Sequence, residues 1–103
     1  MISYQTYSPE FQPQVPELIL DIEQNELGVP VTLADQPDLL DIPNFYQSNR
    51  GNFWLAINEE NEVVGTIALI DTGFAFGVLR KMFVRKDYRS AEHSVSKNLI
   101  SAL

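Results

Sequence analysis

The basic residues of this chain gather around one predicted turn between a strand and a helix. Residues 79–103 hold six of the seven bases and carry a net charge of +4, whereas residues 1–78 carry −11. A loop between a strand end and a helix start offers backbone amides and the positive end of the helix dipole, which together bind phosphate. The pattern therefore indicates a site for a phosphate-bearing ligand. The bases are Arg80, Lys81, Arg85, Lys86, Arg89 and Lys97.

The same charges allow a second interpretation, in which the basic segment pairs with the acidic remainder of the chain. Surface ion pairs of this kind are common, and each contributes little to stability. Charge alone does not separate the two interpretations. Position favours the phosphate site, because the bases lie on both sides of the turn and not along one helix face.

The turn resembles the acetyl-coenzyme A (acetyl-CoA) signature of the GCN5-related N-acetyltransferases, the GNAT superfamily. The matching features are a strand that ends at Val84, a Tyr-Arg step at Tyr88 and Arg89, and a helix start at Val95. The resemblance covers essentially the whole chain, because three upstream segments are also similar to bacterial members. These segments are residues 35–39, 51–54 and 63–69.

This resemblance implies that acetyl-CoA is the co-substrate and that an amine of unknown identity accepts the acetyl group. The amides of residues 89–95 would hold the diphosphate, and the strand from Met82 to Val84 would offer backbone groups to the pantetheine arm. The amine would attack the thioester directly, while the enzyme positions the reactants and polarises the carbonyl through a backbone amide. The predicted cofactor-binding residues are Met82, Phe83, Val84, Arg89, Ser90, Ala91, Glu92, His93, Ser94 and Val95.

Serines replace the glycines of the family pattern at Ser90, Ser94 and Ser96. Glycine permits close approach to phosphate and positive φ, so a Cβ at these places should narrow the cradle. A serine hydroxyl can itself donate to phosphate or cap the helix. We therefore expect a weakened but not abolished phosphate site.

The length of the chain is a second departure from the family pattern. The family domain continues past this helix through further strands and another helix, which usually supply a catalytic tyrosine. The resemblance thus implies that residues 1–103 form one incomplete, C-terminally truncated domain. Residues 75–85 contain no carboxylate, so the base that some members carry on this strand is absent. The catalytic residues stay unassigned.

An alternative is a catalytically silent relative that acts as a binding or oligomerisation module, with a homodimer formed through the free edge of the last strand.

An α+β fold in the order β-α-α-β-β-β-α is predicted to position this turn. It corresponds to the N-terminal part of the acyl-CoA N-acyltransferase fold, with a mixed or antiparallel sheet and flanking helices. Residues 2–7 alternate in polarity like a strand. The helical spacing of four apolar residues predicts an amphipathic helix that Gly28 ends. These residues are Val15, Leu18, Ile19 and Ile22.

A second helical stretch is predicted over residues 35–46, capped by Asp35 and bent or split by Pro43. In the family this region lines the acceptor side of the cleft. The carboxylates of Glu23, Glu26, Asp35 and Asp38 are therefore candidates for holding an amine. For each of them we favour a solvated helix face.

Three strands are predicted next, over residues 53–57, 63–70 and 76–84, before the last helix. Gly65 inside the second strand indicates a bulge or a close backbone approach. Trp54 is expected in or beside the core, and Tyr88 is expected to pack and fix the turn.

Composition excludes several kinds of site. The chain has no cysteine and one histidine, His93, so it offers neither thiolate chemistry nor a metal site. It begins without a basic region followed by an apolar run, and no apolar run reaches about 18 residues. We expect a cytoplasmic protein that has neither nucleic acid nor a membrane as a partner.

Overall fold

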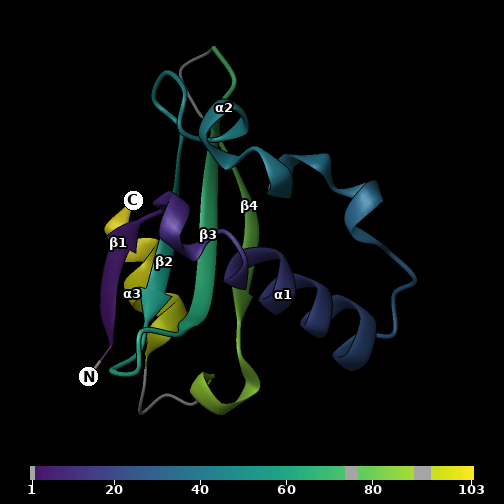
Figure 1. Cartoon of the computed structure of the whole chain (residues 1–103). Helices are drawn as coiled ribbons and strands as arrows, with labels where there is room; N and C mark the ends of the chain where they lie inside the picture. Colours follow the sequence, from purple (N-terminus) through teal and green to yellow (C-terminus); the bar gives the residue numbers. More distant parts are fainter. Residues whose placement is uncertain (1, 74–76, 90–93) are drawn as a thin grey trace.

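One antiparallel sheet forms the centre of the molecule, with strands in the order β1-β2-β3-β4. The computed structural model describes residues 2–73, 77–89 and 94–103. Figure 1 shows the helices around the sheet, which confirms the predicted α+β fold and order of elements. The strands are β1 (Ser3–Thr6), β2 (Asn52–Ile57), β3 (Val63–Asp71) and β4 (Gly77–Val84), and the helices are α1 (Gln14–Leu20), α2 (Ile42–Phe45) and α3 (Val95–Ala102).

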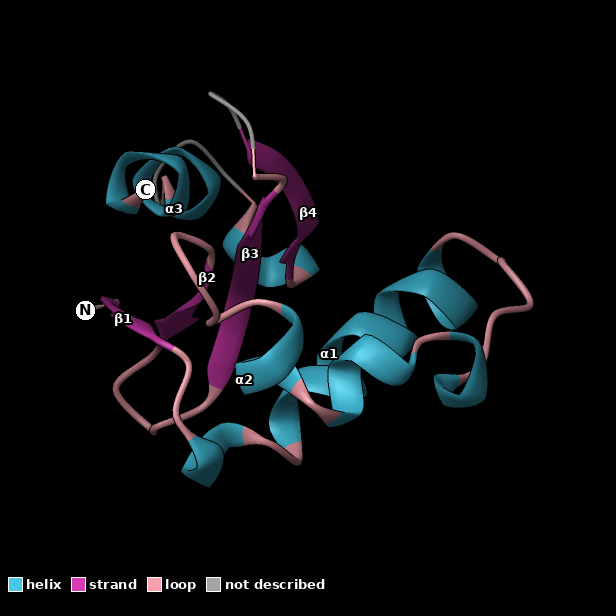
Figure 2. Cartoon of the chain, turned by 90° about the horizontal axis from the view of Figure 1, so that it is seen from above, coloured by secondary structure: helices cyan, strands magenta, loops and turns pink. Residues whose placement is uncertain are grey.

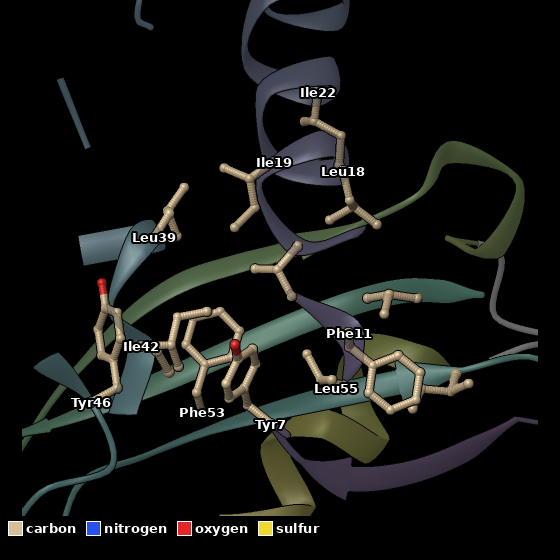
Figure 3. Packing of buried hydrophobic residues seen from close by; sticks show 14 residues of the cluster. Tyr7, Phe11, Leu18, Ile19, Ile22, Leu39, Ile42, Tyr46, Phe53 and Leu55 are labelled. Atoms are coloured by element: carbon tan, nitrogen blue, oxygen red, sulfur yellow. The ribbon is translucent and has the colours of Figure 1, made fainter. Parts of the chain in front are cut away.

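The helices cover both faces of the sheet. In the view from above, α1 and α2 lie on one side of the strands and α3 on the other (Figure 2). The larger core lies under α1 and α2, where Tyr46 and Phe53 meet edge to face with ring centroids 5.2 Å apart (Figure 3). The smaller core lies under α3. Its buried residues are Ala56, Val64, Ile67, Val84, Val95 and Leu99.

The first helix follows the predicted apolar spacing. All four residues of the predicted apolar face are buried in the larger core. Figure 3 shows Leu18, Ile19 and Ile22 there. The helix continues as a π-helical segment over Asp21–Glu26, and Gly28 follows in the left-handed conformation at φ +66°. Glycine adopts this φ without steric cost, so it ends the helix as expected.

The second helical stretch is split, as Pro43 predicted. It consists of two 3₁₀ turns, Leu33–Asp35 and Pro37–Leu40, followed by α2. The prediction that Asp35 caps the stretch is wrong. Thr32 precedes the first turn, and its backbone N–H donates to the Asp35 carboxylate at 2.9 Å.

Two irregularities interrupt the sheet. The pairing of β2 with β3 shifts at Ala56 and Ile57, beside Gly65. The pairing of β3 with β4 shifts between Thr66 and Ala68, where Lys81 and Met82 lie opposite Ile67. Two residues opposite one is the arrangement of a β-bulge, which disrupts the ladder locally. Among the described residues, no helix is long and apolar enough to cross a membrane.

Candidate functional site

The predicted strand, turn and helix follow one another in the structure. Strand β4 ends at Val84, a 3₁₀ turn covers Lys86–Tyr88, and α3 begins at Val95. The predicted site residues Ser90, Ala91, Glu92 and His93 lie outside the described residues. The described site residues lie on both sides of the turn: Met82, Phe83 and Val84 come before it, and Arg89, Ser94 and Val95 come after it.

Gly65 allows α3 to lie against the sheet at this turn. A Cβ built on Gly65 would lie 3.1 Å from side-chain atoms of both Val95 and Leu99, and 3.3 Å from the carbonyl oxygen of Phe83. This confirms the close approach predicted for Gly65. Because Val84 and Val95 belong to the same core, the start of α3 lies beside the end of β4.

The three predicted residues of β4 have different surroundings. Met82 is exposed, Phe83 packs partly on the core under α1 and α2, and Val84 is buried under α3. Met82 also belongs to the β4 bulge. Regular pairing with β3 is interrupted there, as is usual at a β-bulge.

Ser94 lies at one of the three positions where the family pattern has glycine and a positive φ is expected. Its backbone is left-handed, with φ +53° and ψ +31°, and its side chain makes no capping hydrogen bond to α3. The expected positive φ is confirmed, and the hydroxyl does not cap the helix. Val95 is buried, and its side chain packs in the core under α3.

Three bases near the turn pair with acids from the first half of the chain. The Arg89 guanidinium lies 2.8 Å from the Glu26 carboxylate, and Arg85 lies 3.9 Å from Asp21. Arg89 also donates through Nε to the carbonyl of Val84 at 2.7 Å, so it is fixed at the turn. The third base is Lys81. The ion-pair interpretation of the charges is therefore correct for these three bases.

Lys81 belongs to a buried polar network between β4 and the segment that joins α1 to α2. Its ammonium donates to the side-chain oxygen of Gln36 and lies 3.7 Å from the Asp38 carboxylate. Gln36 donates onward to Glu23 at 2.7 Å, and the Tyr46 hydroxyl donates to Asp38. Burial, the hydrogen bond to Asp38 and the negative charge of Asp38 raise the pKa of Tyr46 above its usual value, and the charge of Arg80 opposes them.

The solvated position predicted for Asp38 is therefore wrong, since Asp38 is buried. Glu26 and Asp35 are exposed as expected, and Glu23 is half-buried. The network contains functional candidates that the sequence analysis missed. One signal was present: Arg80 and Lys81 are adjacent in a strand, where successive side chains point to opposite faces, so one of the two bases must face the core side.

Two aromatic residues lie where they were predicted. Trp54 is half-buried and packs on the core under α3. Tyr88 also packs on that core, and its hydroxyl accepts a hydrogen bond from Asn58 at 3.2 Å. Tyr88 thus ties the turn after β4 to the turn between β2 and β3.

Comparison with solved structures identifies close relatives of this fold. An acetyltransferase of the GNAT family from Staphylococcus aureus Mu50 is 37% identical, with a TM-score of 0.93 over 99% of this chain and 63% of that one. An acetyltransferase from Streptococcus agalactiae 2603 is 32% identical, with a TM-score of 0.87 over 98% of this chain and 62% of that one. The chain thus spans less than two thirds of the length of either relative.

A more distant neighbour adds support for the fold alone. It is described as a predicted acetyltransferase with acetyl-CoA from Clostridium acetobutylicum, and it is 15% identical with a TM-score of 0.71 over 99% of this chain and 70% of that one. No protein-family model matches this chain, and no curated protein matches its sequence. Agreement in fold along the whole chain, with identities above 30% to two acetyltransferases, assigns the chain to the GNAT superfamily.

Proposed function

We propose that this chain binds acetyl-CoA across the turn between β4 and α3 and takes part in transfer of the acetyl group to an amine. The observation that carries the proposal is the placement of strained backbone. Four described residues other than glycine have positive φ, and two of them are Asn49 and Asn61, a residue type that tolerates this conformation. The other two, Lys81 and Ser94, lie at the β4 bulge and at the start of α3. Backbone strain of this kind clusters at functional sites.

In this proposal the cofactor runs from the start of α3 along β4. Its diphosphate accepts hydrogen bonds from the amides at the start of α3, where the helix dipole favours negative charge. The pantetheine arm lies along Met82 to Val84, which places the acyl end at the β4 bulge. A backbone amide of the bulge then polarises the thioester carbonyl while the amine attacks its carbon and the thiolate departs.

The acceptor, the general base and the general acid carry no assignment. We propose an amine acceptor because the two relatives above 30% identity are described as acetyltransferases and the superfamily is that of N-acetyltransferases. One expectation from the sequence accompanies the proposal, a cytoplasmic location. A homodimer through the edge of β4, which pairs only with β3 among the described strands, belongs to the alternative of a catalytically silent module, because the pantetheine arm would occupy the same edge.

Thermal unfolding with and without acetyl-CoA tests the proposal. Ligand at a hundredfold excess over its dissociation constant should raise the free energy of unfolding by about 2.7 kcal/mol. ATP at the same concentration is the control, since it carries phosphates but no pantetheine arm. Equal unfolding temperatures with and without acetyl-CoA would contradict cofactor binding by this chain.

A further inference from the structure

The polar network around Lys81 has no role yet in the proposed acetyl transfer. Lys81 is the residue of the β4 bulge that has a left-handed backbone, at φ +52°. This conformation is unfavourable for a residue with a Cβ. It persists only where the surrounding structure holds it.

Contacts on both sides hold Lys81 in this conformation. Its backbone carbonyl accepts a hydrogen bond from the Thr66 hydroxyl on β3 at 2.6 Å. Its side chain contacts Gln36 and Asp38 in the segment between α1 and α2. Thr66 is fully buried, and the Lys81 and Asp38 side chains are 10% and 9% exposed, so water does not compete for these contacts.

The network is satisfied throughout and spans the molecule from the π-helical segment to β4. Gln36 donates a hydrogen bond to Glu23 and accepts one from the Lys81 ammonium. Asp38 pairs with Lys81 and accepts a hydrogen bond from the neutral Tyr46 hydroxyl. No buried side-chain nitrogen or oxygen of the described residues lacks a hydrogen-bond partner. A paired and hydrogen-bonded charge of this kind fixes geometry, whereas loss of one partner leaves an uncompensated charge.

We infer that Lys81 is a positioning residue whose ammonium, held by Gln36 and Asp38, keeps the β4 bulge in the shape that receives the acyl end of the cofactor. The inference rests on the proposed function for the identity of the ligand. Lys81 acts through the backbone of the bulge and not by touching the acyl group. The segment between α1 and α2 thereby sets the geometry of the cofactor side of the site.

Two substitutions of Lys81 separate the side-chain ties from the backbone conformation. Lys81→Met removes the ammonium but keeps a Cβ, so the left-handed backbone loses its support. Lys81→Gly also removes the ties, but glycine adopts positive φ without cost. Arg50→Met is the control, because Arg50 is an exposed base at the far end of the sheet, paired with Asp71.

Binding of acetyl-CoA and of coenzyme A without the acetyl group is measured for each protein by calorimetry. Lys81→Met should weaken acetyl-CoA binding about tenfold more than coenzyme A binding, because unsupported left-handed backbone costs an amount that corresponds to this factor. Lys81→Gly and Arg50→Met should keep the wild-type ratio of the two affinities. A Lys81→Met protein with the wild-type ratio, or a Lys81→Gly protein that loses it as Lys81→Met does, overturns the inference.

Amide hydrogen exchange provides a readout that needs no ligand. The amides of Met82 and Phe83 should exchange faster in Lys81→Met than in Arg50→Met and wild type, and equal exchange overturns the inference. If wild-type protein binds neither acetyl-CoA nor coenzyme A, the proposed function fails. The exchange rates then still decide whether Lys81 holds the bulge.

Discussion

At the scale of single residues, the site depends on backbone conformations that its residue types do not favour. Ser94 precedes α3 with a left-handed backbone although it carries a Cβ, and its hydroxyl makes no capping hydrogen bond to the helix. The GNAT pattern has glycine at this position. The left-handed backbone at Ser94 is therefore a local cost to stability that a glycine would relieve.

Ser94→Gly should raise the free energy of unfolding by about 0.5–1 kcal/mol. The left-handed conformation costs a residue with a Cβ about 1–2 kcal/mol, and the greater freedom of glycine in the unfolded chain offsets part of the gain. Ser96→Gly is the matched control, because Ser96 is exposed inside α3, where glycine should lower stability by roughly 0.5 kcal/mol. Urea unfolding measures both. Equal effects of the two substitutions would contradict the assignment of strain to Ser94.

The three serines that stand at glycine positions of the family pattern are therefore not equivalent. The sequence analysis treated Ser90, Ser94 and Ser96 alike as lost glycines. The structure places Ser94 before the helix with positive φ and Ser96 within it, while Ser90 lies outside the described residues. Of the two described positions, we expect a glycine to raise the free energy of unfolding at Ser94 and to lower it at Ser96.

At the scale of elements, the docking of α3 on the sheet forms the site. A helix and a strand that are adjacent in the chain do not by themselves make a cradle, because the helix start must lie beside the strand end. Gly65 permits this approach on β3, and the side chains of Val95 and Leu99 occupy the space that a Cβ would need.

Gly65→Ala should lower the free energy of unfolding by about 1–3 kcal/mol, since overpacking a well-filled core costs this much. Val95→Ala in the same protein should relieve part of the clash. The cost of the double substitution should then be smaller than the sum of the single costs by at least about 0.5 kcal/mol. Additive costs would show that the Cβ and Val95 do not compete for the same space.

Elements with clear periodicity were predictable from the sequence, whereas the buried polar contacts around the β4 bulge were not. The apolar spacing from Val15 to Ile22 defined the buried face of α1 and of the π-helical segment that continues it, and Pro43 indicated the break before α2, because both signals are local. The burial of Asp38 depends on Lys81, which is distant in sequence. No local pattern reports a partner of that kind, so the network around the β4 bulge was missed.

At the scale of the whole molecule, charges of opposite sign that are separated along the chain meet in space. The π-helical segment contributes Asp21 and Glu26, and the turn after β4 contributes Arg85 and Arg89. These contacts join the acidic first part of the chain to its basic last quarter. Arg89 is central to both interpretations of the charge pattern, since it is both an ion-pair partner and a predicted cofactor ligand.

Glu26→Gln separates these two roles of Arg89. Loss of the ion pair should lower the free energy of unfolding by about 0.2–1 kcal/mol at low salt, because the pair is partly exposed, and the difference should shrink in 1 M sodium chloride. Glu17→Gln is the control, since Glu17 is exposed on the neighbouring helix α1 and makes no ion pair with any described residue.

The same variant tests the phosphate role of Arg89 by its affinity for coenzyme A. If Arg89 holds the diphosphate, removal of the competing carboxylate frees the guanidinium, and Glu26→Gln should bind coenzyme A several-fold more tightly than wild type at low salt. Glu17→Gln also removes one negative charge, so it corrects for the change in net charge. Equal affinities in the two variants would mean that Arg89 serves only to tie the turn to the π-helical segment, and that the amides at the start of α3 hold the diphosphate without it.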